Sequence, residues 1–259
     1  MFALFGVTRT AYAQADALPV FDNPIGIPDM SAVAPPATDA RGVTASLRIL
    51  VLLTVLSIAP SILIMMTSFT RIVVVLALLR QAIGTQQLPP GQVLVGLAVI
   101  MTMLVMAPTW HQMKTEAVDP YLDGRLSQAE AFERGARPLR EFMFRQIETA
   151  ESEENVYLFQ EYAGGPVAED QELQQDEVHL AALVPAFVLS ELKTSFVMGF
   201  RIYLPFLVID MVIASILISM GMMMLPPVLI SLPFKLMLFV LADGWGLVVG
   251  SLLSSFGTA

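Results

Sequence analysis

Two long apolar blocks, separated by an acidic hydrophilic insert, constrain the fold of this 259-residue chain more than any other feature. The first block covers residues 47–110, the insert residues 111–178, and the second block residues 179–259. Of the 23 Asp and Glu residues, 16 lie between Glu116 and Glu177, which leaves both blocks almost without acids. About 20 apolar residues suffice to span a bilayer as an α-helix. The pattern predicts an all-α, membrane-associated protein of two helix–Pro/Gly turn–helix hairpins with a small helical insert.

Composition argues against several classes of function. Charged residues make up only 14% of the chain, whereas soluble domains carry about 25%. The net charge of −9 argues against nucleic-acid binding, which needs clustered Lys and Arg. The chain has no cysteine, and its two histidines cannot build a His-rich metal site alone. With no phosphate-binding Gly-Lys-Ser/Thr loop and no His-Glu-x-x-His pattern, we expect neither an enzyme nor a cofactor.

The N-terminus resembles an export signal. Residues 1–13 hold a short apolar core and end in Ala11-Tyr12-Ala13, which fits signal-peptidase cleavage after Ala13. Because no positive charge precedes the core, two alternatives stay open: a start further upstream, or an unprocessed apolar N-terminus. Residues 14–46 are rich in Pro, Ala, Asp and Gly, and we expect a flexible leader there.

Proline and glycine divide the first block into helices. The apolar run 47–66, which Pro60 should kink, precedes a shorter run over 72–79. Two glycines and two prolines predict a turn over 84–91. The uncharged run 93–110 then predicts a helix of membrane length.

The insert should hold short soluble helices. Ser127 and Glu130 have the spacing of a capping box, and Pro138 suits the first turn of a further helix. Four apolar residues of that helix share one face: Leu139, Phe142, Met143 and Ile147.

The second block should contain at least three helical segments. We expect a helical run over 180–209, a helix over 211–224, and another from Lys235 onward. Breaks are expected at Pro226-Pro227 and at Pro233.

Eight charged side chains interrupt the apolar blocks. None has an opposite charge three or four residues away, the spacing of an ion pair on one helix, so their partners must lie on other helices or other chains. One such charge at mid-bilayer costs roughly 2.5–3.5 kcal/mol, and on this ground we expect copies of the chain to associate. Alternatively, several of them simply mark helix ends at the membrane surface. The eight are Arg71, Arg80, Glu191, Lys193, Arg201, Asp210, Lys235 and Asp243.

A methionine cluster precedes Leu225-Pro226-Pro227. Methionine is unbranched and polarizable, so it fills irregular gaps and can repack. A ring of such loops could seal a pore against ions and still deform around a passing polypeptide, with backbone freedom supplied by Gly221. The alternative is that these methionines only fill the core. The cluster consists of Met220, Met222, Met223 and Met224.

Several of these segments resemble the signature sequences of the FliP family, the P component of the export gate in flagellar type III secretion, which virulence injectisomes share. The resemblance covers about 47–110 and 180–257 and is carried by residues 63–71, 79–90, 190–194, 205–210, 221–227 and 232–245. It implies several copies packed with Q and R partner proteins in a helical assembly, with the methionines at the channel constriction.

The resemblance also implies a location and a task. The chain would be a multi-pass protein of the bacterial inner membrane at the flagellar basal body, beside other export-apparatus membrane proteins. It would pass unfolded flagellar proteins and be required for flagellum assembly. The basic residues Arg71 and Arg80 favour a cytoplasmic 67–92 connection and a periplasmic insert. From residue chemistry alone, an ion- or proton-coupled transporter that uses Asp210 or Glu191 stays open, although no internal repeat supports it.

Overall fold

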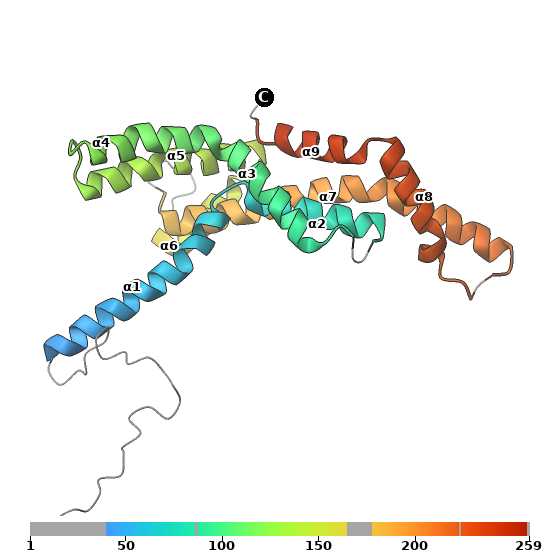
Figure 1. Ribbon diagram of the computed structural model, residues 1–259, viewed down its shortest axis with the longest axis horizontal. Coiled ribbons are helices and arrows are strands. Elements are labelled where there is room, and N and C mark those ends of the chain that lie inside the picture. Colours follow the sequence, from blue (N-terminus) through green and yellow to red (C-terminus); the bar gives the residue numbers. More distant parts are fainter. Residues whose placement is uncertain (1–39, 86–87, 165–177, 223, 258–259) are drawn as a thin grey trace, which may run out of the picture. The chain divides into compact units, whose positions relative to one another are not determined.

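The computed structural model describes residues 40–85, 88–164, 178–222 and 224–257 (Figure 1). All regular elements in these ranges are helical, which confirms the predicted all-α class. The predicted cleavage at Ala13 and most of the leader lie outside the described residues. Contacts divide the chain into two units, Met1–Ser57 and Ile58–Ala259, and the functional residues belong to the second.

The helices follow one another without intervening strands in the described ranges. They are α1 (Ala40–Met65), α2 (Phe69–Ile83), α3 (Gly91–Met113), the π-helix η2 (Lys114–Val118), α4 (Asp119–Leu122), α5 (Gln128–Thr149), α6 (Glu154–Gly164), α7 (Leu180–Ser219), α8 (Pro227–Leu241) and α9 (Gly244–Ser254).

Helix α1 is apolar around its circumference. The stretch Leu47–Ile58 exposes almost all of its side chains. Exposed apolar surface of this extent requires lipid or a protein partner.

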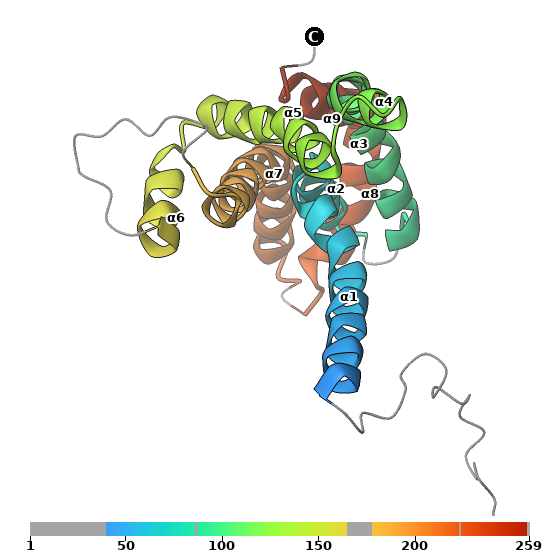
Figure 2. The ribbon, with the colours of Figure 1, turned by 90° about the vertical axis from the view of Figure 1, so that its left-hand side faces the viewer.

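The core of the second unit forms where α2 packs along α7 and α3 (Figure 2). One face of α2 is completely buried, because its apolar residues recur at helical spacing. These residues are Ile72, Val75, Leu76 and Leu79. The segment expected as a connection between spans is therefore a core helix.

Helices α2 and α7 approach most closely at Gly199, which is buried on α7. A Cβ atom at this position would lie 2.2 Å from Leu78 Cδ1 and 3.0 Å from Leu78 Cβ. The missing side chain thus lets α2 lie directly against α7.

The helical run that begins at Gly91 extends past Trp110. It passes through the π-helix and α4 and ends at Leu122, because the polar residues after Trp110 include no helix breaker before Pro120, which sits in the first turn of α4. Two described helical runs are long and apolar enough to cross a membrane, Gly91–Leu122 and Leu180–Ser219. The bent pair α8–α9 would make a third.

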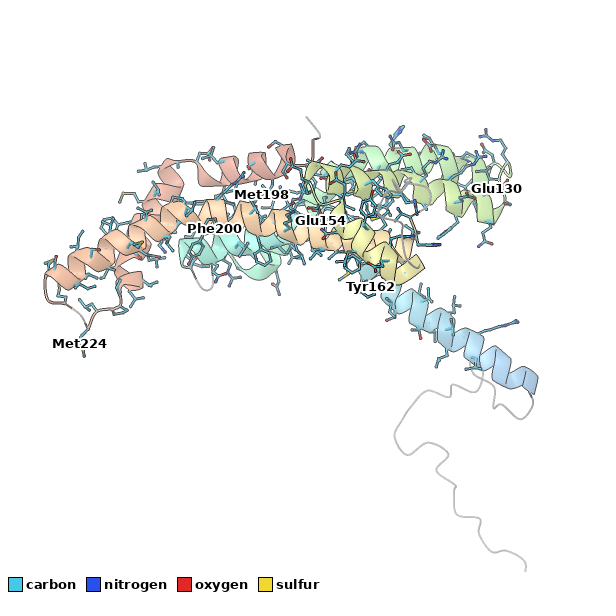
Figure 3. All side chains as sticks on the ribbon, turned by 180° about the vertical axis from the view of Figure 1, so that it is seen from behind. Glu130, Glu154, Tyr162, Met198, Phe200 and Met224 are labelled. Atoms are coloured by element: carbon cyan, nitrogen blue, oxygen red, sulfur yellow. The ribbon has the colours of Figure 1, made fainter. Side chains whose placement is uncertain are left out.

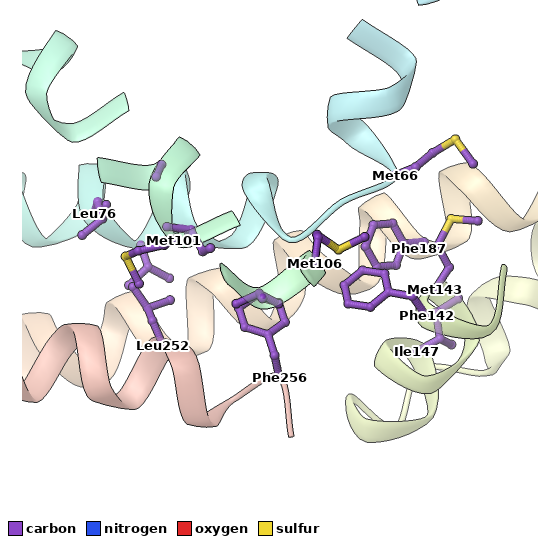
Figure 4. Packing of buried hydrophobic residues seen from close by; sticks show 14 of the residues in the cluster. Met66, Leu76, Met101, Met106, Phe142, Met143, Ile147, Phe187, Leu252 and Phe256 are labelled. Atoms are coloured by element: carbon purple, nitrogen blue, oxygen red, sulfur yellow. The ribbon is translucent and has the colours of Figure 1, made fainter. Parts of the chain in front are cut away.

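The insert contributes α5 to the core. The predicted capping box is confirmed: Glu130 N–H donates to Ser127 Oγ at 3.3 Å, and Ser127 N–H donates to Glu130 Oε2 at 2.8 Å. The predicted apolar face is also buried, and its Phe142 ring meets the Phe187 ring of α7 edge-on at 6.0 Å (Figure 4). The expected helix start at Pro138 is wrong, since α5 is one helix from Gln128.

Two boundaries in the second block also differ from prediction. Helix α7 is continuous through Asp210, and α8 continues through Pro233. Proline is tolerated inside apolar helices because neighbouring helices and local adjustments satisfy the freed backbone groups. The break falls instead at Asp243, whose φ of 48° is left-handed, and α8 and α9 are bent by 63° there.

The close approach at Gly199 gives a stability prediction. Gly199→Ala should destabilise the protein by about 1–3 kcal/mol, because a Cβ would push α2 away from α7. The matched control is Gly250→Ala on α9, where a Cβ would meet nothing within 4 Å. Its change should be neutral or stabilising by up to ~1 kcal/mol. Denaturant titration of the detergent-solubilised protein measures both, and equal effects would contradict the packing argument.

The capping box gives a pH prediction. The hydrogen bonds from Ser127, with a smaller contribution from Arg134, hold the pKa of Glu130 below its usual value. A lowered folded-state pKa means that the stabilisation is present above the unfolded pKa and is lost as pH falls through the folded one. Amide protection in the first turn of α5 should therefore fall below the ordinary Glu pKa of about 4.3. Glu130→Gln should abolish this fall, and an unchanged pH dependence in that variant would contradict the assignment.

Candidate functional site

The second apolar block folds back on itself at a hairpin that carries the methionines. Residues 220–226, called the methionine tip below, join α7 to α8. Figure 3 shows Met224 at one end of the second unit, with Glu130 of the insert at the opposite end. The hairpin thus projects away from the insert.

Gly221 ends α7 in a Schellman motif. Its φ of 77° is left-handed, a conformation that glycine adopts without a Cβ penalty. Gly221 N–H donates to the Ile218 carbonyl at 3.0 Å, and Met222 N–H donates to the Leu217 carbonyl at 3.0 Å. These two bonds satisfy carbonyls that the helix end would leave open.

The tip presents its thioethers outward. Met224 is 97% exposed and Met220 64% exposed, whereas Met222 is half-buried. Met223 lies outside the described residues. Pro227 then starts α8 in the first turn, where its missing N–H costs nothing. Turn chemistry therefore places Met220 and Met224 at the surface, away from the core.

Arg71 forms a buried ion pair with Glu191 between α2 and α7. Arg71 Nε donates to Glu191 Oε2 at 2.8 Å, and Arg71 Nη2 donates to Glu191 Oε1. The two side chains are 1% and 0% exposed. The two oxygens of the carboxylate match the planar guanidinium, and paired charge-assisted hydrogen bonds of this kind are among the strong ones in proteins.

The remaining N–H groups of Arg71 reach the C-terminal segment and the insert. Nη1 donates to the carbonyl and hydroxyl of Ser255 at 3.0 and 3.1 Å, and Nη2 donates to Gln146 Oε1 at 3.0 Å. The guanidinium also lies 4.1 Å from the ring centroid of Phe256. All five donors of the guanidinium are thereby used, and four separate segments meet at one side chain.

A second ion pair, with Lys235 buried and Asp210 partly exposed, joins α7 to α8. Lys235 Nζ donates to Asp210 Oδ2 at 2.6 Å, and Ser231 Oγ donates to Asp210 Oδ1 at 2.5 Å. Lys235 Nζ also lies 3.4 Å from the carbonyl of Ala82, in the last turn of α2, where the helix dipole favours a cation. We call Asp210, Ser231, Lys235 and the Ala82 carbonyl the hairpin clamp.

The other four intramembrane charges lie in more open surroundings. Lys193 is exposed and donates to Ser152 Oγ at 3.1 Å, with Glu154 Oε1 3.9 Å away. Arg80 is half-buried beside Gly91, and Asp243 is exposed at the start of α9. Arg201 is exposed and lines a cleft of about 960 Å³ that α7 forms with α8 and α9.

One expectation therefore needs correction. Four of the eight charges pair with one another, Arg71 with Glu191 and Asp210 with Lys235, and Lys193 lies near Glu154 of the insert. An isolated copy can thus neutralise its most deeply buried charges, and their cost alone does not demand other copies. The paired residues are 120 and 25 positions apart in the sequence. The spacing of three or four residues that identifies ion pairs on one helix therefore cannot find them.

Sequence reasoning also missed the neutral members of both networks. Gln146, Ser231 and Ser255 supply uncharged hydrogen-bonding groups, and Phe256 supplies a ring face. The one available signal was the spacing of four between Ser231 and Lys235, which places them on the same face of a helix.

The membrane-length helix α7, joined by ion pairs to α2 and to α8, and the second membrane-length run Gly91–Leu122 fit an α-helical membrane protein. Comparisons with known proteins narrow this class. The model of the FliP family matches residues 52–252. The chain is 49% identical over 220 residues to the flagellar biosynthetic protein FliP of Bacillus subtilis, covering 85% of this chain and 96% of that protein.

Two further relatives agree. The proteins of the same description from Pectobacterium carotovorum and Aquifex aeolicus are 52% and 50% identical over 214 and 211 residues. These alignments each cover 82% of this chain, and 80% and 86% of the relatives. The chain belongs to the FliP family.

The Arg71 network gives a third prediction. Arg71→Met leaves Glu191 buried without a counter-charge and should cost about 3–5 kcal/mol of stability. Arg71→Met combined with Glu191→Leu should cost clearly less, because no charge is left unpaired. Lys193→Gln serves as the exposed control and should change stability by less than ~1 kcal/mol. Denaturant titration in detergent measures all three, and a single variant no worse than the double one would contradict the pairing.

Proposed function

We propose that this chain is a core subunit of the flagellar type III protein export gate. With copies of itself and with Q and R partner proteins, it forms the channel through which unfolded flagellar proteins cross the inner membrane. It acts as a non-enzymatic conduit and is required for flagellum assembly. Membership of the FliP family supports this proposal, as do the exposed methionines at the end of the hairpin.

The observation that carries the proposal is the exposure of the tip. Met224 is 97% exposed at the end of the hairpin, so its side chain adds almost no packing within the subunit itself. Flexible thioethers from several copies can close around an axis and repack when a polypeptide passes. Met220, Met222, Met223 and Met224 then line the constriction, and Gly221 lets the tip turn.

Exposed apolar surface supports assembly. Large apolar side chains are exposed along both arms of the hairpin, on α7 and on α8. Surface of this kind is covered by lipid or by protein partners. We therefore place α7 and α8 against neighbouring subunits and the bilayer, where the exposed charges Lys193, Arg201 and Asp243 can contact neighbouring subunits.

The proposed location is the bacterial inner membrane at the flagellar basal body, with the insert on the periplasmic side. Arg71 cannot count as a cytoplasmic surface charge, because it is buried in an ion pair. The orientation therefore rests on Arg80.

Substituting the tip tests the function. The triple variant Met222→Ala, Met223→Ala and Met224→Ala should leave assembly intact and make the membrane permeable to small ions, because the seal loses its flexible apolar side chains. Ion conductance of cells with equal amounts of assembled complex is the measurement. The control is Met211→Ala, an exposed methionine on α7 outside the tip, which should not leak. A triple variant that conducts no more than the native complex would contradict the sealing role.

A further inference from the structure

We propose that the hairpin clamp is a positioning device that fixes where the methionine tip sits. This inference rests on the proposed function of the tip as a seal. Asp210, Ser231 and Lys235 do not contact the polypeptide in this proposal. They act through the two helical arms that carry the tip.

The clamp closes the base of two arms of nearly equal length. Ser219, the end of α7, lies nine positions after Asp210, and Pro227, the start of α8, lies eight positions before Lys235. At a rise of 1.5 Å per residue the arms are about 13 Å and about 12 Å long. If one helix slipped along the other at the clamp, the far end of its arm would move by the same distance. One side of the tip would then be displaced relative to the other.

Little else holds the arms together. In the described residues 211–222 and 224–230, Leu217 is the only buried side chain. Most of the apolar residues in these arms are exposed, and exposed residues contribute little packing energy. The ion pair and the Ser231 hydrogen bond are thus the main fixed contacts near the tip.

The clamp also fixes the hairpin that carries the tip to a helix of the core. Lys235 is 97% buried and reaches the Ala82 carbonyl, so the hairpin is fixed to the end of α2 as well as to itself. Gly84 ends α2 with a φ of 86°, and a Cβ there would lie 3.8 Å from Lys235 Nζ. The Arg71 network in turn holds α2 to α7. Contacts therefore connect the core to the clamp, and the two helical arms connect the clamp to the tip.

The charges that face the clamp come from three helices. Asp210 lies on α7, Lys235 on α8, and the dipole of the last turn of α2 points its negative end at Lys235. A carboxylate held by both a lysine and a serine is suited to fixing helices. A proton relay needs its carboxyl group free to exchange, so the clamp geometry favours positioning.

Substitutions in the complete gate complex separate these roles. Lys235→Met removes the ion pair and should raise ion conductance about tenfold at equal amounts of assembled complex, which corresponds to a shift of ~1.4 kcal/mol between sealed and open tips. The variant Lys235→Arg, which keeps a cation beside Asp210 and the Ala82 carbonyl, should retain the seal. Ser215→Ala on the outer face of α7 is the matched control and should conduct as the native complex does.

If Lys235→Met does not accumulate, the milder variant Ser231→Ala tests the positioning role of the clamp. Ser231→Ala leaves no charge unpaired and removes one hydrogen bond to Asp210. It should raise conductance about fivefold, the factor that corresponds to a hydrogen bond of ~1 kcal/mol. Native sealing in Ser231→Ala, together with native sealing or no accumulation in Lys235→Met, would overturn the proposal.

Two results distinguish this inference from the function on which it rests. If the triple methionine variant leaks and both clamp variants seal, the clamp proposal fails and the proposed function stands. If the triple methionine variant seals, the proposed function itself fails. An Asp210→Asn complex that seals but exports nothing would assign Asp210 a direct role in transport and overturn the positioning role.

Discussion

A guanidinium buried among apolar helices is tolerated only when all of its N–H groups find acceptors, and Arg71 meets this condition. Its partners lie on α7, on α5 and at the end of the chain, so one side chain fixes where these segments meet. The rest of the unit depends on this point, because α2 holds α7 and α3 on its other faces. Removing the carboxylate of Glu191 would leave Arg71 as an unpaired buried charge, which is strongly destabilising.

Internal neutralisation changes the reason for expecting an assembly. The eight intramembrane charges first suggested that a lone copy could not exist in a membrane, and the two ion pairs remove the main part of that cost. What a lone copy cannot bury is its apolar surface, which α1, α7 and α8 expose over much of their length. Surface of this extent is covered by lipid or by a protein partner, so the proposed association of copies rests on this surface and no longer on the cost of the buried charges.

Local features of the fold could be predicted from the sequence. The capping box at Ser127 and the buried face of α5 follow from residue chemistry within one turn of helix. The helix expected over 211–224 instead ends at Ser219, because Gly221 terminates it in the left-handed conformation. The predicted helix start at Pro138 and the predicted break at Pro233 are wrong, since both prolines lie inside continuous helices. The break at Asp243 was missed although Asp-Gly is a turn signal, since it lay within an uninterrupted apolar run.

The candidate site was only half accessible to sequence reasoning. Composition pointed to the methionines and to the charges, but the pairing of Arg71 with Glu191 joins residues 120 apart. Such contacts depend on tertiary packing, which the spacing rules of a single helix do not describe.

The most direct test of the account is whether the tips of several copies converge. The chain has no native cysteine, so Met224→Cys introduces a single thiol at the methionine that is most exposed among the described residues. Disulfides form only when the two Cα atoms come within about 7 Å. Oxidation of the assembled complex should therefore link copies covalently through position 224 and leave a Tyr162→Cys variant, with its thiol on α6, unlinked. Unlinked Met224→Cys chains in an intact complex would contradict the convergence of the tips on a common channel.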